Sequence, residues 1–214
     1  MIDPNIAPAH APFALDKTSL RQQLLAQRKA MPAEVRARAQ DALGAHLIPW
    51  LEHLRGVKGE SLSTCVGVYW PIAGEPDLTP AWAVLSTRGF DLALPVATAR
   101  GHVLEYRAWN GSALAQRDAS GVPAPLDAPA CVVDVVLIPC VGVQAGGWRL
   151  GYGGGYFDRT LAAWAERKDA PAIATMGVAF ERQRCDFEPD AHDRRLDALL
   201  TENGVQHWRR NAGS

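Results

Sequence analysis

The sequence predicts a single-domain α/β fold of the Rossmann-like class, with a mainly parallel sheet flanked by helices on both faces. Apolar runs of strand length alternate with longer segments of helical periodicity, as expected when helices connect parallel strands. No internal repeat, low-complexity tract or linker divides the 214 residues, which suffice for one domain with a sizeable core. A glycine cluster at residues 149–159 lies between an apolar run and a helical pattern.

The two ends of the chain differ from its middle. Residues 1–15 are rich in alanine and proline, which predicts a disordered arm. We expect one catalytic α/β domain over residues 16–208 and a flexible tail over residues 209–214. The first residues lack the basic start and apolar block that are typical of a signal peptide.

The composition is that of a soluble globular protein, with 48% hydrophobic and 21% charged residues. A formal net charge of −1 argues against a nucleic-acid partner, and no apolar run reaches the length that a membrane span requires. Four cysteines are spread along the chain without a C-x-x-C pair. This spacing favours reduced thiols in a cytoplasmic protein and no cysteine metal site.

The first helix is expected to begin at Asp16 or Lys17, with Asp16 as its cap. At about 100° per residue, three basic residues share one narrow stripe with the leucines of this segment. These residues are Lys17, Arg21 and Arg28. Basic residues normally oppose the apolar face of a helix, so we expect the three to reach into a cleft that holds an anion. The alternative is that their long side chains pass the leucines and end in water.

The remaining elements follow the same alternation. A second helix should carry Pro32 in its first turn and end or kink at Pro49. Further helices are expected over residues 78–88 and 156–166. Five apolar or alternating runs are predicted as strands: 65–70, 91–95, 103–109, 132–138 and 173–180. A last apolar stretch covers residues 198–200.

The glycine loop at residues 149–159 reads Arg-Leu-Gly-Tyr-Gly-Gly-Gly-Tyr-Phe-Asp-Arg. Clustered glycines allow backbone conformations with positive φ and a close approach of a ligand to the backbone. A loop that runs into a helix start also directs N–H groups and the positive helix end at one place, which suits phosphate. The loop is neither the dinucleotide fingerprint, because Tyr156 replaces the third glycine, nor a P-loop. The alternative is a flexible loop capped by a helix.

Further candidates lie outside the glycine loop. Trp70 and Glu75 follow the first strand, where Trp70 can stack on a flat ring and Glu75 can accept hydrogen bonds from ring N–H groups. A core tryptophan and a turn carboxylate are the alternatives. Asp158, in the first turn of the helix after the loop, and Asp193 are candidate magnesium ligands beside a bound phosphate. For Asp158 the alternative is complementing the helix dipole. His192 is either an acid or metal ligand or a surface residue.

The glycine loop resembles the signature of the 5-formyltetrahydrofolate cyclo-ligase family. Three further segments are similar to family motifs: the basic helix with Lys17 and Arg21, the loop at residues 74–77, and the tail at residues 192–202. The resemblance covers about residues 17 to 205 and implies an architecture like that of phosphosugar isomerases and coenzyme A transferases. Family members often carry a second tyrosine where this chain has Phe157.

The resemblance implies ATP- and Mg²⁺-dependent cyclisation of 5-formyltetrahydrofolate to 5,10-methenyltetrahydrofolate, with release of ADP and phosphate. It implies folate contacts for Trp70, Glu75 and Tyr156, and magnesium ligation by Asp158 and Asp193. The catalytic candidates are Arg149 and Tyr156. The residues expected to bind ATP are Lys17, Thr18, Ser19, Leu20, Arg21, Arg149, Leu150, Gly151, Tyr152, Gly153, Gly154, Gly155, Tyr156 and Phe157.

Two other functions stay open at this point. An enzyme like the phosphosugar isomerases or coenzyme A transferases would need a carboxylate base or nucleophile in the cleft and no ATP. A nucleotide- or folate-binding protein without turnover would keep the glycine loop and tolerate the loss of Asp158. The expected partners are a reduced folate and ATP, with no nucleic acid and no membrane, and the expected oligomeric state is a monomer.

Overall fold

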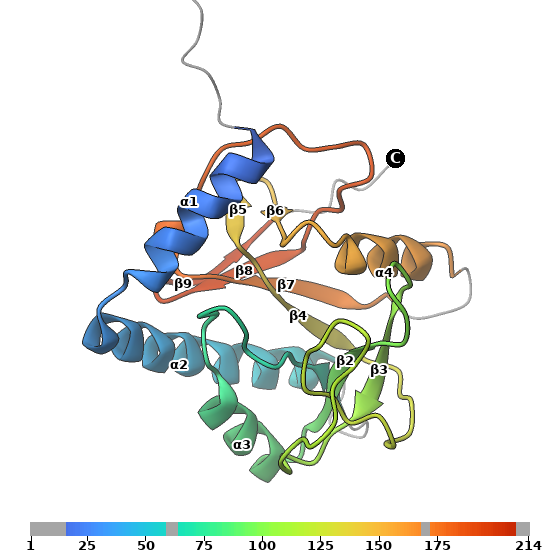
Figure 1. Cartoon of the computed structure of the whole chain (residues 1–214). Helices are drawn as coiled ribbons and strands as arrows, with labels where there is room; N and C mark the ends of the chain where they lie inside the picture. The colour runs from blue at the N-terminus through green and yellow to red at the C-terminus, as the bar shows by residue number, and fades with distance from the viewer. Residues whose placement is uncertain (1–15, 59–63, 168–171, 209–214) are drawn as a thin grey trace, which may run out of the picture.

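A computed structural model describes residues 16–58, 64–167 and 172–208 of the chain. The predicted arm at residues 1–15 and the predicted tail at residues 209–214 lie outside the described residues. The chain forms a central sheet with helices on both faces (Figure 1). The α/β class, the mainly parallel sheet and its two helical layers are therefore confirmed.

The central sheet has seven strands in the order β3-β2-β1-β4-β7-β8-β9. Its strands are β1 (Cys65–Gly67), β2 (Asp91–Ala97), β3 (Leu104–Ala108), β4 (Val135–Pro139), β7 (Ala174–Val178), β8 (Ala198–Thr201) and β9 (Gly204–His207). β1 pairs in parallel with β2 and with β4, and the parallel pairing continues through β7 to β8. The edge strands β3 and β9 are antiparallel to their neighbours. The strand order reverses between β1 and β4, and in open α/β sheets ligands bind at such a switch point, beyond the carboxyl ends of the strands.

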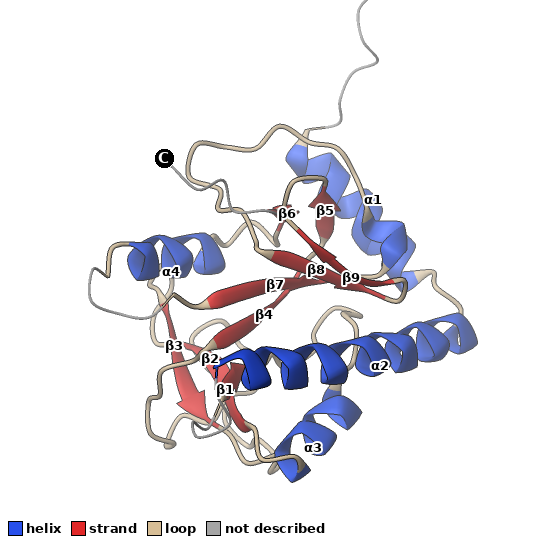
Figure 2. Ribbon diagram, turned by 180° about the vertical axis from the view of Figure 1, so that it is seen from behind, coloured by secondary structure: helices blue, strands red, loops and turns tan. Residues whose placement is uncertain are grey.

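The two faces of the sheet carry separate hydrophobic clusters because successive strand side chains point to opposite faces. On β4, Val135 and Leu137 join the cluster beneath α2 (Ala33–Lys58) and α3 (Thr79–Thr87). Val136 and Ile138 join the cluster beneath α4 (Tyr156–Ala165). All four are fully buried, which explains why this strand reads as an uninterrupted apolar run. Figure 2 shows α2 lying across one face of the sheet.

The first helix, α1 (Lys17–Lys29), does not pack on the central sheet. Its leucines pack with a two-stranded hairpin made of β5 (Gly142–Gln144) and β6 (Trp148–Leu150) in a third, smaller cluster. Asp16 caps the helix by accepting hydrogen bonds from the backbone N–H groups of Thr18 and Ser19, at 2.8 and 3.0 Å. The hairpin leads directly into the glycine loop, so α1 and the loop are brought to the same end of the sheet (Figure 1).

The structure differs from the sequence-based expectation in three places. α2 runs through Pro49 to Lys58, so of the two alternatives, an end or a kink at Pro49, the end is wrong; the buried Leu47 and Leu51 on either side hold the helix against the core. The hairpin β5–β6 and the edge strand β9 were not predicted, since each strand has only three or four residues. Several predicted strands extend further than the observed ones, as at residues 65–70, where only Cys65–Gly67 is strand.

Candidate active site

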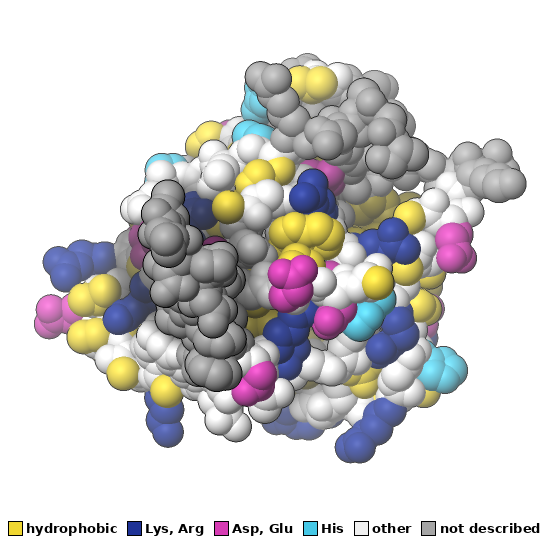
Figure 3. All heavy atoms as spheres, turned by 90° about the horizontal axis from the view of Figure 1, so that it is seen from above, with side chains coloured by type: hydrophobic (Ala, Val, Ile, Leu, Met, Phe, Trp, Pro, Cys, Tyr) yellow, Lys and Arg dark blue, Asp and Glu magenta, His cyan; other side chains and the backbone are white. Residues whose placement is uncertain are grey.

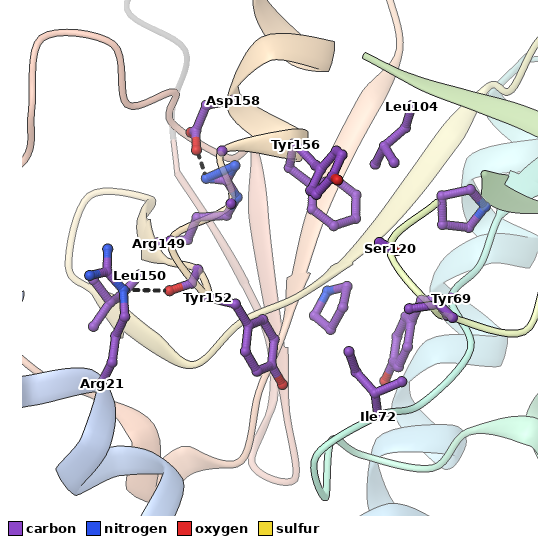
Figure 4. Close-up of a pocket in the computed structure, with 18 of the residues that line it drawn as sticks. Arg21, Tyr69, Ile72, Leu104, Ser120, Arg149, Leu150, Tyr152, Tyr156 and Asp158 are labelled. Carbon is purple, nitrogen blue, oxygen red and sulfur yellow. Dashed lines mark hydrogen bonds and ion pairs between the residues drawn. The ribbon is translucent and has the colours of Figure 1, made fainter. Parts of the chain in front are cut away.

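A cavity of about 440 Å³ lies at the carboxyl ends of the parallel strands, where the strand order reverses. Its walls come from α1, from the segments after β1 and β4, from the glycine loop and from the start of α4 (Figure 4). Figure 4 shows Arg21, Arg149 and Asp158 on one side of this cavity, and Tyr69, Ile72 and Leu104 on the other. The cationic side consists of Lys17, Arg21, Arg149 and residues 151–155. The carboxylate side consists of Trp70, Ile72, Glu75, Leu104 and Val122.

The glycine loop takes backbone conformations that favour glycine. Gly153 has φ of +92° and Gly155 has φ of +65°, both in the left-handed region. Gly155 is the residue before α4, and no side chain caps this helix end. The first N–H groups of α4 therefore have no side-chain partner at a position that lines the cavity. This is the arrangement that binds anions at helix N-termini.

Arginine side chains from two elements meet at the loop. Arg21 of α1 donates from Nε to the carbonyl oxygen of Gly151 at 2.8 Å, which places its guanidinium beside Gly153. Arg149, the middle residue of β6, is only 5% exposed and pairs with Asp158 of α4 at 2.8 Å. The expectation that cations of the first helix lie across from the glycine loop is confirmed for Arg21, and Lys17 lines the same cavity.

Lys17 joins α1 to the segment that precedes β8. Its Nζ contacts a carboxylate oxygen of Asp190 at 2.7 Å and one of Asp193 at 2.9 Å. Partial burial disfavours the charged forms of Lys17 and Asp193, but their mutual contact and their hydrogen bonds outweigh this effect. The pKa of Lys17 is therefore raised and that of Asp193 is lowered. Lys17 and Asp193 are therefore charged at neutral pH, and both line the cavity together with Asp190.

Carboxylates that could hold a metal ion also line the cavity. Among the described residues, Asp190, His192 and Asp193 form one group whose potential ligand atoms lie within 4.8 Å of one another. Asp158 lines the same cavity but is not part of that group, and its carboxylate faces Arg149. Carboxylate oxygens are among the donors that Mg²⁺ prefers. Asp158 and Asp193 therefore fit a magnesium ion in donor chemistry.

The carboxylate side contains a buried carboxyl group, that of Glu75, whose pKa is raised. Glu75 is 3% exposed and accepts a hydrogen bond from the backbone N–H of Ile72 at 2.9 Å. Burial raises its pKa to about 7, although the Ile72 N–H, the Tyr152 hydroxyl and the charge of Arg28 act in the opposite direction. A buried carboxyl group poised near neutral pH in a cavity is typical of functional sites.

Trp70 stands beside Glu75 in the cavity wall. It is half-buried and meets Trp109 edge to face, with ring centroids 6.2 Å apart and an interplanar angle of 79°. Ile72, Leu104 and Val122 also line the cavity. This side can therefore receive a flat ring and accept hydrogen bonds from the ring's N–H groups.

The structure brings most of the sequence-predicted site residues together. Lys17, Arg21, Trp70, Glu75, Asp193 and all of residues 149–158 line the cavity. Three residues of α1 predicted to bind ATP do not line it: Thr18 is exposed, Ser19 donates to Asp16, and Leu20 packs in the hydrophobic cluster between α1 and the hairpin. Arg28, which we expected to reach the cleft, is fully buried behind it.

Other cavity residues were not predicted from the sequence. They are Tyr69, Ile72, Pro95, Leu104, Asp118, Ser120 and Val122, with Pro139 and Asp190. The turn at residues 118–122 reaches the cavity because Asp118 accepts a hydrogen bond from the backbone N–H of Ala97 at 2.8 Å. In the sequence, Asp-Ala-Ser-Gly indicates only a turn. Its place beside the cavity depends on long-range pairing that no local signal reports.

The surface and the helices bear on the partners that were expected. On the face shown in Figure 3, basic and acidic side chains are interspersed, with no large field of one sign. Within residues 16–58, 64–167 and 172–208, no helix has both the length and the apolar character needed to cross a membrane.

The comparisons with known proteins agree with the fold and the loop. The sequence model of the 5-formyltetrahydrofolate cyclo-ligase family matches residues 14–202. A 5-formyltetrahydrofolate cyclo-ligase of Mycolicibacterium smegmatis is 34% identical over 195 residues, which cover 86% of this chain and 93% of that protein.

Two solved structures have a similar fold. The 5,10-methenyltetrahydrofolate synthetase of Aquifex aeolicus has a TM-score of 0.71 and 27% identity, covering 94% of this chain and 96% of that one. That of Mycoplasma pneumoniae has a TM-score of 0.65 and 20% identity, covering 88% and 99%. The family match spans most of the described chain, including the cavity and the glycine loop. The chain therefore belongs to the 5-formyltetrahydrofolate cyclo-ligase family.

Proposed function

We propose that this protein converts 5-formyltetrahydrofolate to 5,10-methenyltetrahydrofolate and couples the reaction to conversion of ATP to ADP and phosphate. The observation that carries the proposal is one cavity with two unlike sides. Its cationic side presents a glycine loop, an uncapped helix start and basic side chains, which suit a triphosphate. Its carboxylate side presents Glu75 beside Trp70, which suits a pterin ring.

The chemistry follows from a poor leaving group. The oxygen of a formamide does not leave readily, so the formyl oxygen first attacks the γ-phosphorus of ATP and the bond to the β-phosphate oxygen breaks, releasing ADP. The neighbouring N10 then attacks the activated formyl carbon, loses its proton, and phosphate departs as the ring closes. Neither step requires a nucleophile from the protein. The protein contributes by positioning the reactants and stabilising the transferred phosphoryl group.

The side chains divide between these tasks. Arg149 and Arg21 neutralise charge on the phosphates, and Lys17 adds a further positive charge from α1. Tyr156 lies between the two sides in Figure 4, where its ring and hydroxyl can contact both the nucleotide and the folate. Glu75 accepts hydrogen bonds from the pterin N–H groups and Trp70 packs against the ring.

Asp158 and Asp193 are the proposed ligands of a magnesium ion that accompanies ATP. When bound, such an ion neutralises phosphate charge and polarises the phosphoryl group. Asp158 also holds the Arg149 guanidinium at 2.8 Å, and Asp193 holds the Lys17 ammonium at 2.9 Å. The same two carboxylates therefore orient Arg149 and Lys17. We further propose that the enzyme acts as a cytoplasmic monomer.

One assay tests the function directly. The protein is mixed with ATP, Mg²⁺ and 5-formyltetrahydrofolate, and the methenyl chromophore and ADP are followed together. We expect both products to appear in equal amounts and only when all components are present. Product without ATP, or absence of product, would contradict the proposal. A sugar-phosphate isomerisation in the same preparation would instead favour the isomerase-like alternative.

A further inference from the structure

A fully buried arginine lies directly behind the cavity. Arg28, near the end of α1, donates from Nη1 to the hydroxyl of Tyr152 at 2.8 Å and from Nη2 to the carbonyl oxygen of Cys140. Its own carbonyl oxygen accepts a hydrogen bond from Arg36, which also donates to the carbonyl oxygen of Gly74. The Nε of Arg28 has no protein partner among the described residues. Burying a guanidinium is costly unless nearby groups compensate its charge, and the carboxyl group that this network reaches is Glu75.

Tyr152 connects that arginine to Glu75. Its ring belongs to the glycine loop and is 40% exposed, while its hydroxyl turns inward between Arg28 and Glu75. Burial raises the pKa of Glu75, while the Tyr152 hydroxyl and the charge of Arg28 act in the opposite direction, as expected for a hydroxyl that faces the carboxylate. In Figure 4, Tyr152 lies between the cationic side and Ile72 of the carboxylate side. The Tyr152 hydroxyl therefore belongs to the glycine loop and acts on Glu75, the proposed acceptor of the pterin hydrogen bonds.

We propose that the Tyr152 hydroxyl, held by Arg28, is a positioning group that orients the Glu75 carboxylate and thereby couples the nucleotide side of the cavity to the folate side. The inference rests on the proposed function, because it takes Glu75 as the group that receives the pterin. It extends that function by giving Tyr152 and Arg28 a role in folate binding, although neither is needed to contact the folate.

The charged and titratable groups around Glu75 determine how its pKa changes when the Tyr152 hydroxyl is removed. Arg28 approaches from α1, Tyr152 from the glycine loop, Tyr69 from the segment after β1 and Cys140 from the end of β4. Of these, only Arg28 is positively charged, and Tyr69 and Cys140 stay neutral because burial raises the pKa of each. Tyr152→Phe removes one of the groups that favour the ionised carboxylate. The pKa of Glu75 should then rise further.

The test measures the affinity for 5-formyltetrahydrofolate by calorimetry, without ATP, from about pH 5.5 to about pH 8.5, a range that brackets the pKa of Glu75. In the wild type, affinity should fall as the pH drops through about 7, because a protonated Glu75 cannot accept two hydrogen bonds from the pterin. In Tyr152→Phe this transition should move to higher pH by about 0.5 unit or more. In Glu75→Gln it should disappear.

A matched control removes a tyrosine hydroxyl elsewhere. Tyr106 is buried in the core cluster beneath α4, and its hydroxyl has no hydrogen-bond partner in the part of the chain that the structure describes. Tyr106→Phe makes the same chemical change and should leave the pH transition where it is. Thermal unfolding of all variants identifies any that have lost their fold, and Tyr152 is suited to substitution because its ring is partly exposed.

A second readout measures coupling between the two sides. The affinity for 5-formyltetrahydrofolate is compared with and without a non-hydrolysable ATP analogue, which gives a coupling factor that must be reciprocal. We expect this factor to differ from 1 in the wild type and to approach 1 in Tyr152→Phe. An unchanged pH transition and coupling factor in Tyr152→Phe, or a transition that survives in Glu75→Gln, would overturn the inference. If the wild type nevertheless forms methenyltetrahydrofolate with ATP, the proposed function stands and only the inference fails.

Discussion

The two sides of the cavity are built in different ways. The cationic side comes from one short stretch, residues 149–155, and from the first turns of α1, and two of its cations, Lys17 and Arg149, are paired with carboxylates. The carboxylate side collects Trp70, Glu75, Leu104 and Val122 from segments far apart in the chain, around one buried acid. Charge on the first side is shared among several residues, whereas the second depends on a single carboxyl group. Substitutions on the cationic side should therefore act mainly on turnover and ATP, and those at Glu75 on folate binding and pH dependence.

The largest effect is expected for Arg149→Met. The substitution removes a nearly buried cation from the phosphate side and leaves Asp158 without its 2.8 Å partner. Loss of a preorganised group that stabilises transition-state charge lowers kcat by about 10²–10³. Steady-state rates of product formation measure this. Arg55→Met, which removes a guanidinium that packs on Phe90 outside the cavity, should keep its kcat. A kcat for Arg149→Met within about tenfold of the wild type would mean that the cationic side does not stabilise the transition state.

The next effect is expected for Asp158→Asn. Asparagine keeps an oxygen that can accept from Arg149 but loses the negative charge that Mg²⁺ prefers. We expect kcat to fall by about 10–100-fold and the Mg²⁺ concentration for half-maximal rate to rise, with little change in thermal stability. Removal of Mg²⁺ with a chelator should stop the wild-type reaction. Asp41→Asn, at an exposed position of α2, is the control. Unchanged magnesium dependence in Asp158→Asn would contradict its role as a ligand.

Glu75 should make the stability of the protein depend on pH. Its pKa is raised from 4.5 to about 7 by burial, so between these values the folded protein keeps a proton that the unfolded chain has lost. The contribution is fully present below about pH 4.5 and is lost as the pH rises to about 7, on the order of 1–3 kcal/mol. Glu75→Gln removes this dependence, so its stability relative to the wild type should improve from pH 5 to pH 8, by on the order of 1–3 kcal/mol. Urea unfolding at both pH values measures it. A constant difference between the two proteins would exclude a raised pKa for Glu75.

A smaller effect is expected for Gly153→Ala. The added Cβ has room, because its nearest neighbour is an atom of Arg21 at 3.8 Å, but φ of +92° is unfavourable for alanine. The strain of about 1–2 kcal/mol should shift the loop and raise the KM for ATP about tenfold. Gly111→Ala imposes the same kind of strain at φ of +85°, outside the cavity, and should lower stability while leaving the KM for ATP unchanged. Equal KM values in the two variants would mean that the loop conformation is not needed for ATP.

The smallest effect is expected at the start of α1. Asp16 caps the helix through the N–H groups of Thr18 and Ser19, one residue before Lys17. Asp16→Ala should fray this turn and raise the KM for ATP about twofold, because Lys17 is then held less firmly. Asp16→Asn should behave like the wild type, since asparagine caps equally well. A similar change in both variants would attribute the effect to charge instead of capping.

Local patterns were sufficient for the cationic side. The glycines, the flanking arginines and the helix start lie within eleven consecutive residues, so their chemistry could be read without knowing the fold. The stripe of basic residues on α1 also followed from helix periodicity alone, and Lys17 and Arg21 do line the cavity. Periodicity could not separate Arg28 from these two. Its burial behind the cavity depends on Cys140 and Tyr152, which are more than one hundred residues away.

The sequence by itself determined the α/β class, the alternation of strands and helices, and the glycine loop, because these depend on side-chain periodicity and backbone freedom within a short window. The tertiary structure alone decided where the turn at residues 118–122 lies, that the hairpin β5–β6 supports α1, and that Glu75 is buried beside Tyr152. The physical reason is that a pKa depends on desolvation and on neighbouring charges in space. Those neighbours come from separate elements, and only folding brings them together.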